Sequence, residues 1–303
     1  MLAHVPSIPP RLGVDRDVQR SHVWTVVLTG DAPPLSAAGA RRHGCRPSSR
    51  WSAPCSPSAQ RTLERASRFA PAGQMITVLA RRQAAAWEPQ LAAVPEAQRI
   101  VQPVYRGRAA EVLLPLLTIA AQDPFATVVV LPIDQPADHD ARFLRYVRRA
   151  VWAVALRPDV PILIGAHPYA CVADGWIEPG APVEGLEDLA VHTVKRFVND
   201  ATPAERRRLF DASALVSTSI FVARATTLLA LAQRTLPEVL EALEPLEAAF
   251  GRPEEGLLCE AIYECMPRTG LDPLERAPEL AVLGLPDVVW RAPGREALEL
   301  IAS

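Results

Sequence analysis

The sequence predicts an α/β fold built on a mostly parallel central sheet. Short apolar runs rich in β-branched residues alternate with longer segments in which apolar residues recur at helical spacing, and no internal repeat interrupts this order. The clearest run is residues 127–131 (TVVVL), bounded by Pro124 and Pro132, which is typical of a strand buried on both faces. Strands that alternate with helices usually become parallel neighbours, so we expect an α/β sandwich.

The expected elements follow one another through most of the chain. Strands are expected at residues 23–29, 75–79, 100–101, 127–131, 161–165, 175–180, 191–198, 218–222, 280–283 and 288–289. Helices are expected at residues 58–69, 84–93, 110–121, 141–156, 204–210, 225–250 and 257–266. Breaks are expected at Pro89 and Pro237, because proline lacks the amide hydrogen that a helix interior needs.

The chain divides into a tail and one domain. Residues 1–22 contain three prolines and no periodicity, so they are expected to form a flexible N-terminal tail. Residues 23–303 show no boundary strong enough to split them and are expected to form a single domain. Within it, residues 30–57 form a long irregular stretch, which is typical of a functional or mobile loop.

Composition excludes several classes of protein. The net charge of −2 and the lack of a basic stripe with interleaved aromatic residues argue against nucleic-acid binding. No apolar run approaches ~20 residues, so no membrane span is expected, and no signal peptide is evident. The five cysteines are odd in number and lack the spacing of metal ligands, so reduced thiols in a cytoplasmic protein are expected.

Asp134 follows the clearest predicted strand. Ligands of open α/β sheets bind beyond the carboxyl ends of the strands, so Asp134 is placed to meet a divalent metal or a phosphorylated ligand. One Asp together with substrate phosphates is a common way to hold Mg²⁺. The alternative is that Asp134 caps the helix that starts near residues 137–140. The stretch itself leaves both interpretations open.

Four short segments carry a resemblance to a known family. They are residues 102–109 (QPVYRGRA), 128–135 (VVVLPIDQ), 174–180 (DGWIEPG) and 213–218 (SALVST). In this order they resemble the Q-P-x-N-R-G-T-A loop, the strand ending in P-S-D-H, the Y-G-W-I-E-x-G turn and the G-x-L-W-N-S/T segment of sugar-1-phosphate nucleotidylyltransferases, specifically mannose-1-phosphate guanylyltransferases. The resemblance covers residues 23–294. It implies a three-layer α/β/α sandwich with a Rossmann-like, mostly parallel mixed sheet.

The resemblance also implies a reaction. Mannose 1-phosphate would attack the α-phosphate of GTP, releasing pyrophosphate and forming GDP-mannose without a covalent intermediate. In this family, catalysis comes from alignment and from neutralising the phosphate charge with Mg²⁺, basic side chains and backbone N–H groups. The expected ligands are GTP or GDP-mannose and a sugar phosphate, with Mg²⁺ held by Asp134 in an active enzyme.

Six further site residues follow from the resemblance. The nucleotide is expected at Gly30, Gln102 and Gly107, and the sugar at Gly175, Glu178 and Ser217. The alternative for residues 102 and 107 is a polar loop that caps the next helix. The alternative for residues 175 and 178 is a solvent-exposed turn.

The phosphate end departs from the family pattern. In place of the family's G-G-x-G-T-R-L loop, residues 30–35 read GDAPPL; the two prolines remove N–H donors, and Asp31 adds negative charge. Lys195 is the only lysine of the chain, and neither family lysine is matched. Arg46 and Arg50 lie near the position of the first and are possible phosphate contacts.

At three other positions, a charged residue of the family is replaced by an uncharged residue or by one of opposite charge. Ser48 and Asp200 stand at the positions of the two lysines, and Ala292 stands at that of the second metal Asp.

These losses predict weak or absent turnover. Removing one charged donor costs about 3 kcal/mol of transition-state stabilisation, roughly a hundredfold in rate. We therefore expect a mannose-1-phosphate guanylyltransferase-like protein that is weakly active or is a pseudoenzyme. The alternatives are a working enzyme that has recruited arginines, and a non-catalytic nucleotide-sugar-binding or regulatory subunit. Such a subunit would form a homodimer or pair with an active paralogue.

Overall fold

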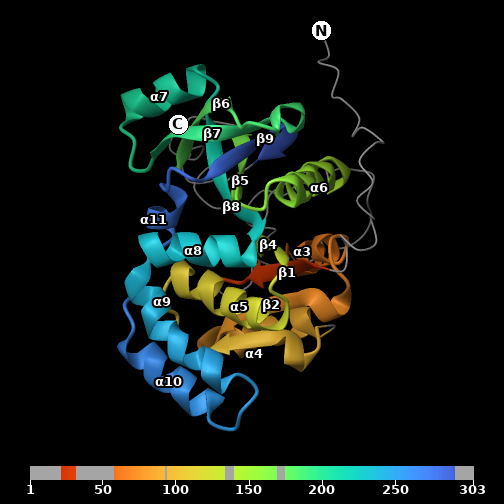
Figure 1. Cartoon of the computed structure of the whole chain (residues 1–303), viewed down its shortest axis with the longest axis vertical. Coiled ribbons are helices and arrows are strands. Elements are labelled where there is room, and N and C mark those ends of the chain that lie inside the picture. The colour runs from red at the N-terminus through yellow and green to blue at the C-terminus, as the bar shows by residue number, and fades with distance from the viewer. Residues whose placement is uncertain (1–21, 32–57, 93, 134–139, 169–174, 291–303) are drawn as a thin grey trace.

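Nine strands form one continuous sheet in the part of the chain that the structure describes. The structure is a computed structural model that describes residues 22–31, 58–92, 94–133, 140–168 and 175–290 (Figure 1). The strand order is β3-β2-β1-β4-β8-β5-β9-β7-β6. The strands are β1 (Val23–Leu28), β2 (Met75–Ala80), β3 (Arg99–Gln102), β4 (Thr127–Pro132), β5 (Ile162–Pro168), β6 (Trp176–Pro182), β7 (Val191–Val198), β8 (Leu215–Arg224) and β9 (Ala281–Trp290).

The helices connect and cover these strands. They are α3 (Ser58–Ala66), α4 (Arg81–Leu91), α5 (Arg108–Gln122), α6 (Asp140–Leu156), α7 (Pro203–Asp211), α8 (Ala225–Thr235), α9 (Pro237–Leu243), α10 (Glu255–Cys265) and α11 (Asp272–Glu275). In the part of the chain described, no helix is long and apolar enough to cross a membrane.

The first four strands are parallel. β1 pairs with β2 on one side and with β4 on the other, so that Val26 lies opposite both Ile76 and Val130, and β3 extends the sheet beyond β2. Every residue of β1, β2 and β4 is buried, as their unbroken apolar sequences predict for strands covered on both faces. Because the four strands are parallel, the loops that follow them all emerge at the same edge of the sheet.

The remaining five strands close into a ring. β6 pairs with β8 as well as with β7, through Trp176 opposite Val216 and Ile177 opposite Leu215. The strands β8, β5, β9, β7 and β6 therefore form a closed, mostly antiparallel barrel in which β5 and β9 are the parallel pair. The outer strands β4, β1, β2 and β3 continue from β8.

The predicted three-layer sandwich with a Rossmann-like, mostly parallel sheet is therefore wrong. Four of the nine strand pairings between described residues are parallel and five are antiparallel. A parallel pair needs a crossover of about a dozen residues or more, and only eight residues, 183–190, separate β6 from β7. The alternation of strand and helix stops after β5, and the chain turns back on itself to build the ring.

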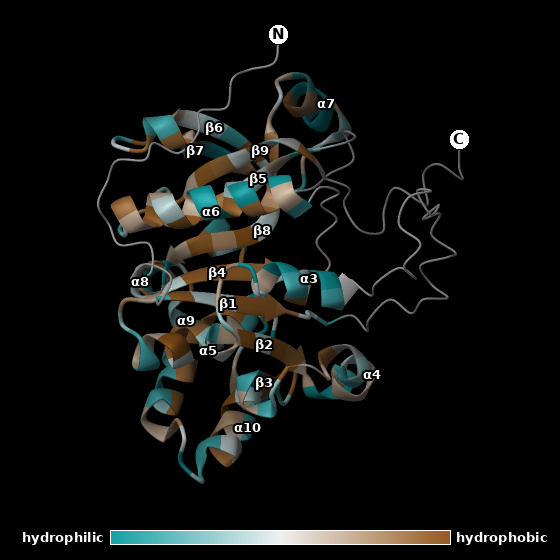
Figure 2. Ribbon diagram, turned by 90° about the vertical axis from the view of Figure 1, so that its right-hand side faces the viewer, coloured by the Kyte–Doolittle hydropathy of each residue, from teal (hydrophilic) through white to brown (hydrophobic). Residues whose placement is uncertain are grey.

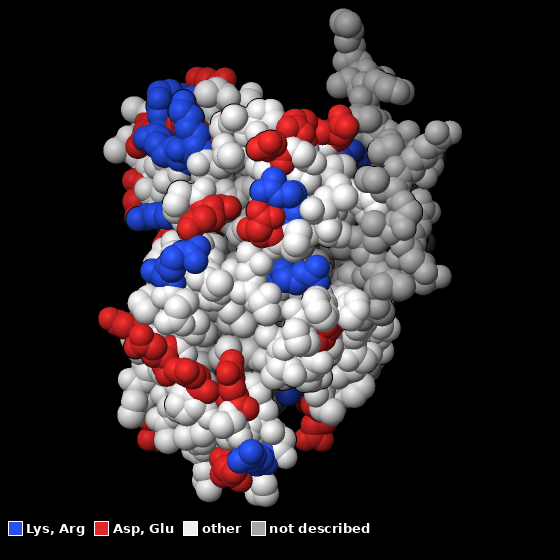
Figure 3. Space-filling view, viewed as in Figure 1, with Lys and Arg blue, Asp and Glu red and all other residues white. Residues whose placement is uncertain are grey.

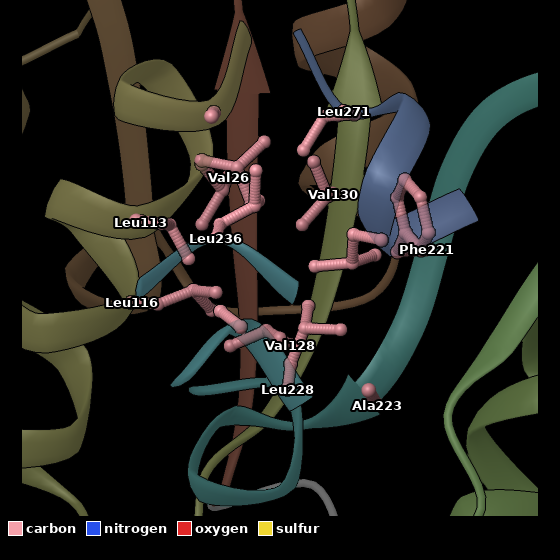
Figure 4. Packing of buried hydrophobic residues seen from close by; sticks show 14 of the residues in the cluster. Val26, Leu113, Leu116, Val128, Val130, Phe221, Ala223, Leu228, Leu236 and Leu271 are labelled. Carbon is pink, nitrogen blue, oxygen red and sulfur yellow. The ribbon is translucent and has the colours of Figure 1, made fainter. Parts of the chain in front are cut away.

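Among the described residues, two hydrophobic cores lie on opposite faces of the sheet. One contains side chains of α3, α4 and α6, and the other contains side chains of α5, α8 and α9. The strands β1, β2 and β4 are hydrophobic along their length, whereas helices such as α6 are polar on their outer sides (Figure 2). Figure 4 shows the second core, where side chains of β1, β4 and β8 meet those of α5 and α8: Val26, Leu113, Leu116, Val128, Val130, Phe221 and Leu228.

Proline positions decide two of the helix predictions. The expected break at Pro237 is confirmed, because α8 ends at Thr235 and Pro237 begins α9, where its missing N–H costs nothing. The expected break at Pro89 is wrong, because α4 continues through it to Leu91. The two short strands expected at residues 280–283 and 288–289 form the single strand β9.

Candidate ligand-binding site

A bulge in β8 marks the junction between the ring and the parallel strands. Ile164 of β5 pairs with Ile220, but the next residue, Gly165, pairs with Ser217, so Thr218 and Ser219 are two extra residues in β8. The backbone of Ser219 adopts a left-handed conformation with φ of 53°. Bulges of this kind are found next to functional sites, because they turn side chains out of the regular pleat.

Hydroxyl groups satisfy the backbone atoms that the bulge frees. The Thr218 Oγ1 donates to the carbonyl of Ile164 at 2.7 Å. The Ser217 Oγ accepts from the N–H of Ser219 at 3.1 Å. The sequence Ser-Thr-Ser therefore makes the irregular backbone possible, since buried polar groups without partners would be costly.

A pocket of about 390 Å³ opens beside this bulge. It is lined by Ser219 of β8, by Glu275 of α11, by residues 268–272 before and at the start of α11, and by Tyr105, Gly107 and Arg108 at the start of α5. Figure 1 shows α11 close to α8, beside the strands of the ring. The pocket thus joins the loop after β3 to the C-terminal part of the chain.

Glu275 supplies a buried carboxylate to the pocket. Its residue surface is 8% exposed, and one carboxylate oxygen accepts a hydrogen bond from the Ser217 Oγ at 2.9 Å. Burial raises the pKa of Glu275 above its ordinary value, the nearby Asp272 raises it further, and the Ser217 hydrogen bond opposes this. Asp272 in turn accepts a hydrogen bond from the side-chain amide of Asn199. These groups give one wall of the pocket several hydrogen-bond acceptors.

Gly107 allows two loops to pack closely. Its φ is +91°, and a Cβ atom there would clash with the carbonyl of Thr269. The same carbonyl accepts a hydrogen bond from the N–H of Ala109 at 3.1 Å, and the Thr269 N–H donates to the carbonyl of Arg106 at 3.0 Å. A glycine is therefore required at the point where the loop after β3 docks on the segment before α11.

The segment after β1 is held by acidic and basic side chains. The N–H of Gly30 donates to the Glu111 Oε1 at 2.6 Å. Asp31 accepts a hydrogen bond from Arg82, and its Oδ2 lies 3.7 Å from the Nη2 of Arg268. Burial raises the pKa of Glu111 to about 7, although the Gly30 hydrogen bond lowers it in part. The Glu111 Oε2 is buried and has no hydrogen-bond partner among the described residues.

Gln102 lies deeper than its predicted role suggests. It is 1% exposed, and its side-chain amide donates to the Tyr263 hydroxyl at 3.0 Å inside the protein. Its amide therefore ties the end of β3 to α10. The prediction that Gln102 contacts a nucleotide stays untested.

Two predicted sugar residues lie beside the pocket, and a third takes part in a surface ion-pair network. The carbonyl of Gly175 accepts a hydrogen bond from the N–H of Ser217 at 2.8 Å, so these two residues adjoin the bulge. The Glu178 Oε1 lies 2.8 Å from the Nη2 of Arg196 and 3.3 Å from that of Arg208. Figure 3 shows basic side chains gathered around α7, where this network lies. Glu178 is not part of the pocket wall, and its contact with a sugar stays a prediction.

Several sequence predictions fall outside the described residues. Asp134, Arg46 and Arg50 are among these, as are the other family positions Ser48 and Ala292 and the tail of residues 1–21. Within the described residues, no group of three or more His, Cys, Asp or Glu side chains is placed to hold a metal ion. Asp31, the described carboxylate after β1, is neutralised by arginines. A magnesium site at Asp134, which lies outside the described residues, stays a prediction.

The structure adds site residues that the sequence analysis missed. Arg82 is the second residue after β2, so the rule that ligands meet the carboxyl ends of parallel strands is a usable signal for it. Arg268, Asp272 and Glu275 come from a segment more than 150 residues after β3, and no spacing in the sequence links them to that loop. Ser219 is identified as a site residue only from the structure, because it is one of the two extra residues of the β8 bulge.

Comparison with known proteins defines the fold but no family. No protein-family model matches the sequence, and no curated protein matches it. The structure is similar to that of mannose-1-phosphate geranyltransferase from Thermus thermophilus, with a TM-score of 0.69 and 22% identity over 89% of this chain and 76% of that chain. It is also similar to mannose-6-phosphate isomerase from Helicobacter pylori, with a TM-score of 0.68 and 12% identity over 89% of this chain and 100% of that chain.

The chain thus shares its fold with two proteins that are named for mannose phosphates. At these identities, the likeness shows the fold alone. The resemblance carried by the four sequence segments therefore holds at the level of structure, and membership of the guanylyltransferase family stays a prediction.

Replacing Gly107 with Ala should separate the two loops that build the pocket. We expect the free energy of unfolding to fall by about 2 kcal/mol, because a side chain is strained at a positive φ and has no space beside Thr269. Gly256→Ala is the control: it lies in α10 with open space around it and should stabilise the helix by about 1 kcal/mol at most. Urea denaturation measures both. Equal stability of Gly107→Ala and wild type would contradict the loop packing.

Replacing Glu111 with Gln should flatten the dependence of stability on pH. The folded-state pKa of about 7 lies above the ordinary 4.5, so this carboxyl contributes stability at low pH that is lost as the pH rises through 7. Wild type should therefore lose up to about 3 kcal/mol more than Glu111→Gln between pH 5 and pH 8. Urea denaturation at both pH values measures this. Glu64→Gln, an exposed change in α3, is the control; parallel curves for wild type and Glu111→Gln would refute the assignment.

Proposed function

We propose that this chain is a mannose-1-phosphate guanylyltransferase-like protein that binds a nucleotide sugar or a sugar phosphate and turns over GTP weakly or not at all. The observation that carries the proposal is the pocket between the β8 bulge, the start of α5 and α11. Its walls combine positive charge with hydrogen-bond acceptors.

A phosphorylated sugar matches this distribution of groups. Arg108 and Arg268 provide guanidinium groups, which pair well with phosphate oxygens because of their planar, forked geometry. Ser219, Asp272 and Glu275 provide acceptors for sugar hydroxyls. The volume of about 390 Å³ lies in the usual range of small-molecule pockets. The sequence resemblance and the shared fold favour a mannose derivative over other sugars.

Guanylyl transfer would need more positive charge than the described residues offer. The reaction is the attack of mannose 1-phosphate on the α-phosphate of GTP, which requires neutralisation of the triphosphate. After β1, where the family has a glycine-rich loop, Asp31 already engages Arg82 and Arg268. An active enzyme would also need Mg²⁺, for which Asp134 is the proposed protein ligand. Arg46 and Arg50 are further proposed phosphate contacts.

The second candidate is a non-catalytic subunit that senses a nucleotide sugar. The pairing of Asp31 with two arginines favours this second candidate. The pairing hinders the binding of a triphosphate, but it does not involve Glu275, which can still contact a sugar. Such a subunit would act as a homodimer or together with an active paralogue. Both candidates bind a nucleotide sugar in the same pocket.

Ligand-dependent stability and pyrophosphate release test the proposal together. GDP-mannose at 100 times its Kd should stabilise the protein by about 2.7 kcal/mol, whereas GTP, Mg²⁺ and mannose 1-phosphate should release pyrophosphate at least about a hundredfold more slowly than with an active guanylyltransferase. Thermal unfolding and a coupled pyrophosphate assay measure the two effects.

Glu275→Gln should weaken GDP-mannose binding roughly tenfold, because the variant loses a charged acceptor. Glu279→Gln, an exposed change four residues later, should leave binding unchanged and serves as the matched control. Fast formation of GDP-mannose would contradict the impaired turnover. A lack of stabilisation by GDP-mannose, GTP and mannose 1-phosphate alike would contradict the binding site.

A further inference from the structure

Asp31 lies between two arginines from distant parts of the chain. Arg82 is in the first turn of α4, directly after β2, and its guanidinium bonds the Asp31 Oδ1. Arg268 lies between α10 and α11, and its Nη2 is 3.7 Å from the Asp31 Oδ2. The side-chain amide of Gln83 donates to the backbone carbonyl of Asp31 at 3.2 Å and fixes the segment. An acidic side chain is therefore centred in a cationic site at the edge of the parallel strands.

We propose that Arg82 and Arg268 form a binding site for the phosphate groups of a polyphosphate, and that Asp31 occupies this site as an internal anion. This inference deepens the proposed function and rests on it, since it assigns the part of the site that would hold the diphosphate of a nucleotide sugar. A ligand phosphate and the Asp31 carboxylate compete for the same two guanidinium groups.

The exposure of the three side chains supports competition over a permanent ion pair. The side chains of Arg82 and Arg268 are 61% and 67% exposed, whereas that of Asp31 is 28% exposed. An incoming anion can therefore reach both cations from solvent. Ion pairs between exposed side chains contribute little to stability, so the protein loses little when Asp31 gives way to a phosphate. A phosphate also offers three oxygens to the two guanidinium forks, where the carboxylate offers two.

The position of the arginine pair connects it to the pocket. Arg268 lines the pocket, and its guanidinium lies 5.5 Å from the centre of the Tyr105 ring, which lines it too. Arg82 and Asp31 follow β2 and β1, at the edge where ligands of parallel sheets bind. A ligand whose sugar contacts Glu275 could thus extend its phosphates past Arg268 toward Arg82.

Glu111 engages a backbone donor next to Asp31. It accepts the N–H of Gly30, the described N–H group that immediately precedes Asp31. Asp31 and Glu111 thus both engage donors in this part of the chain. Wild-type protein therefore binds polyphosphates weakly, and neutralising Asp31 strengthens their binding.

Titration calorimetry of the full chain with inorganic pyrophosphate at low salt tests this inference. Asp31→Asn should bind pyrophosphate about tenfold more tightly than wild type, because the internal anion is removed while its shape is kept. Glu260→Gln is the matched control: it makes the same change of charge beside Arg81, the residue next to Arg82, and should change affinity less than about twofold. Adding Arg82→Gln to Asp31→Asn should abolish the gain.

Several outcomes would overturn the inference. One is equal affinity of wild type and Asp31→Asn, and another is a gain as large in Glu260→Gln, which would reflect net charge alone. A gain that survives Arg82→Gln would also refute it. Circular dichroism checks that each variant folds, and Asp31→Ala replaces Asp31→Asn if the latter does not. Stabilisation of wild type by GDP-mannose is measured separately, so failure of this inference is distinguishable from failure of the proposed function.

Discussion

The bulge in β8 is the feature on which the architecture depends. β8 pairs with β4 through residues 221–224, with β6 through Leu215 and Val216, and with β5 on both sides of the bulge. The two extra residues lie between the part of β8 that pairs with β4 and the part that pairs with β6, where the strand passes from the parallel strands into the ring. Ser217, Thr218 and Ser219 satisfy the freed backbone with their own hydroxyl groups or present them to the pocket. The same irregularity therefore creates both the barrel and the wall of the binding site.

The site combines elements that are far apart in the sequence. The parallel strands deliver the segments after β1, β2 and β3 to one edge, and the segment before α11 packs onto them at Gly107. This close approach places Arg268 and Glu275 within one pocket with Arg108. Arg268 then lies beside Asp31, after β1, whereas Glu275 lies beside Ser217 of the ring. That arrangement is the physical basis for expecting a ligand with a phosphate at one end and hydroxyl groups at the other.

The sequence predicts the positions of helices and strands better than it predicts which strands pair with one another. Apolar runs such as residues 127–131 and helical periodicity such as residues 141–156 locate their elements within a few residues, because burial on a face is encoded locally. The prediction of a mostly parallel sheet is wrong, because the partner of each strand depends on connection length and on the bulge. Gly107 could be singled out from a local motif, whereas Glu275 could not, since its link to Ser217 arises from the packing of α11 against the ring.

The location of GDP-mannose in a crystal of the complex tests this binding mode most directly. We expect the sugar to lie against Ser219 and Glu275 and the diphosphate to lie beside Arg268, with Asp31 displaced from the arginine pair. GDP-mannose bound elsewhere on the molecule, or crystals soaked at saturating concentration in which this pocket holds no ligand, would contradict it.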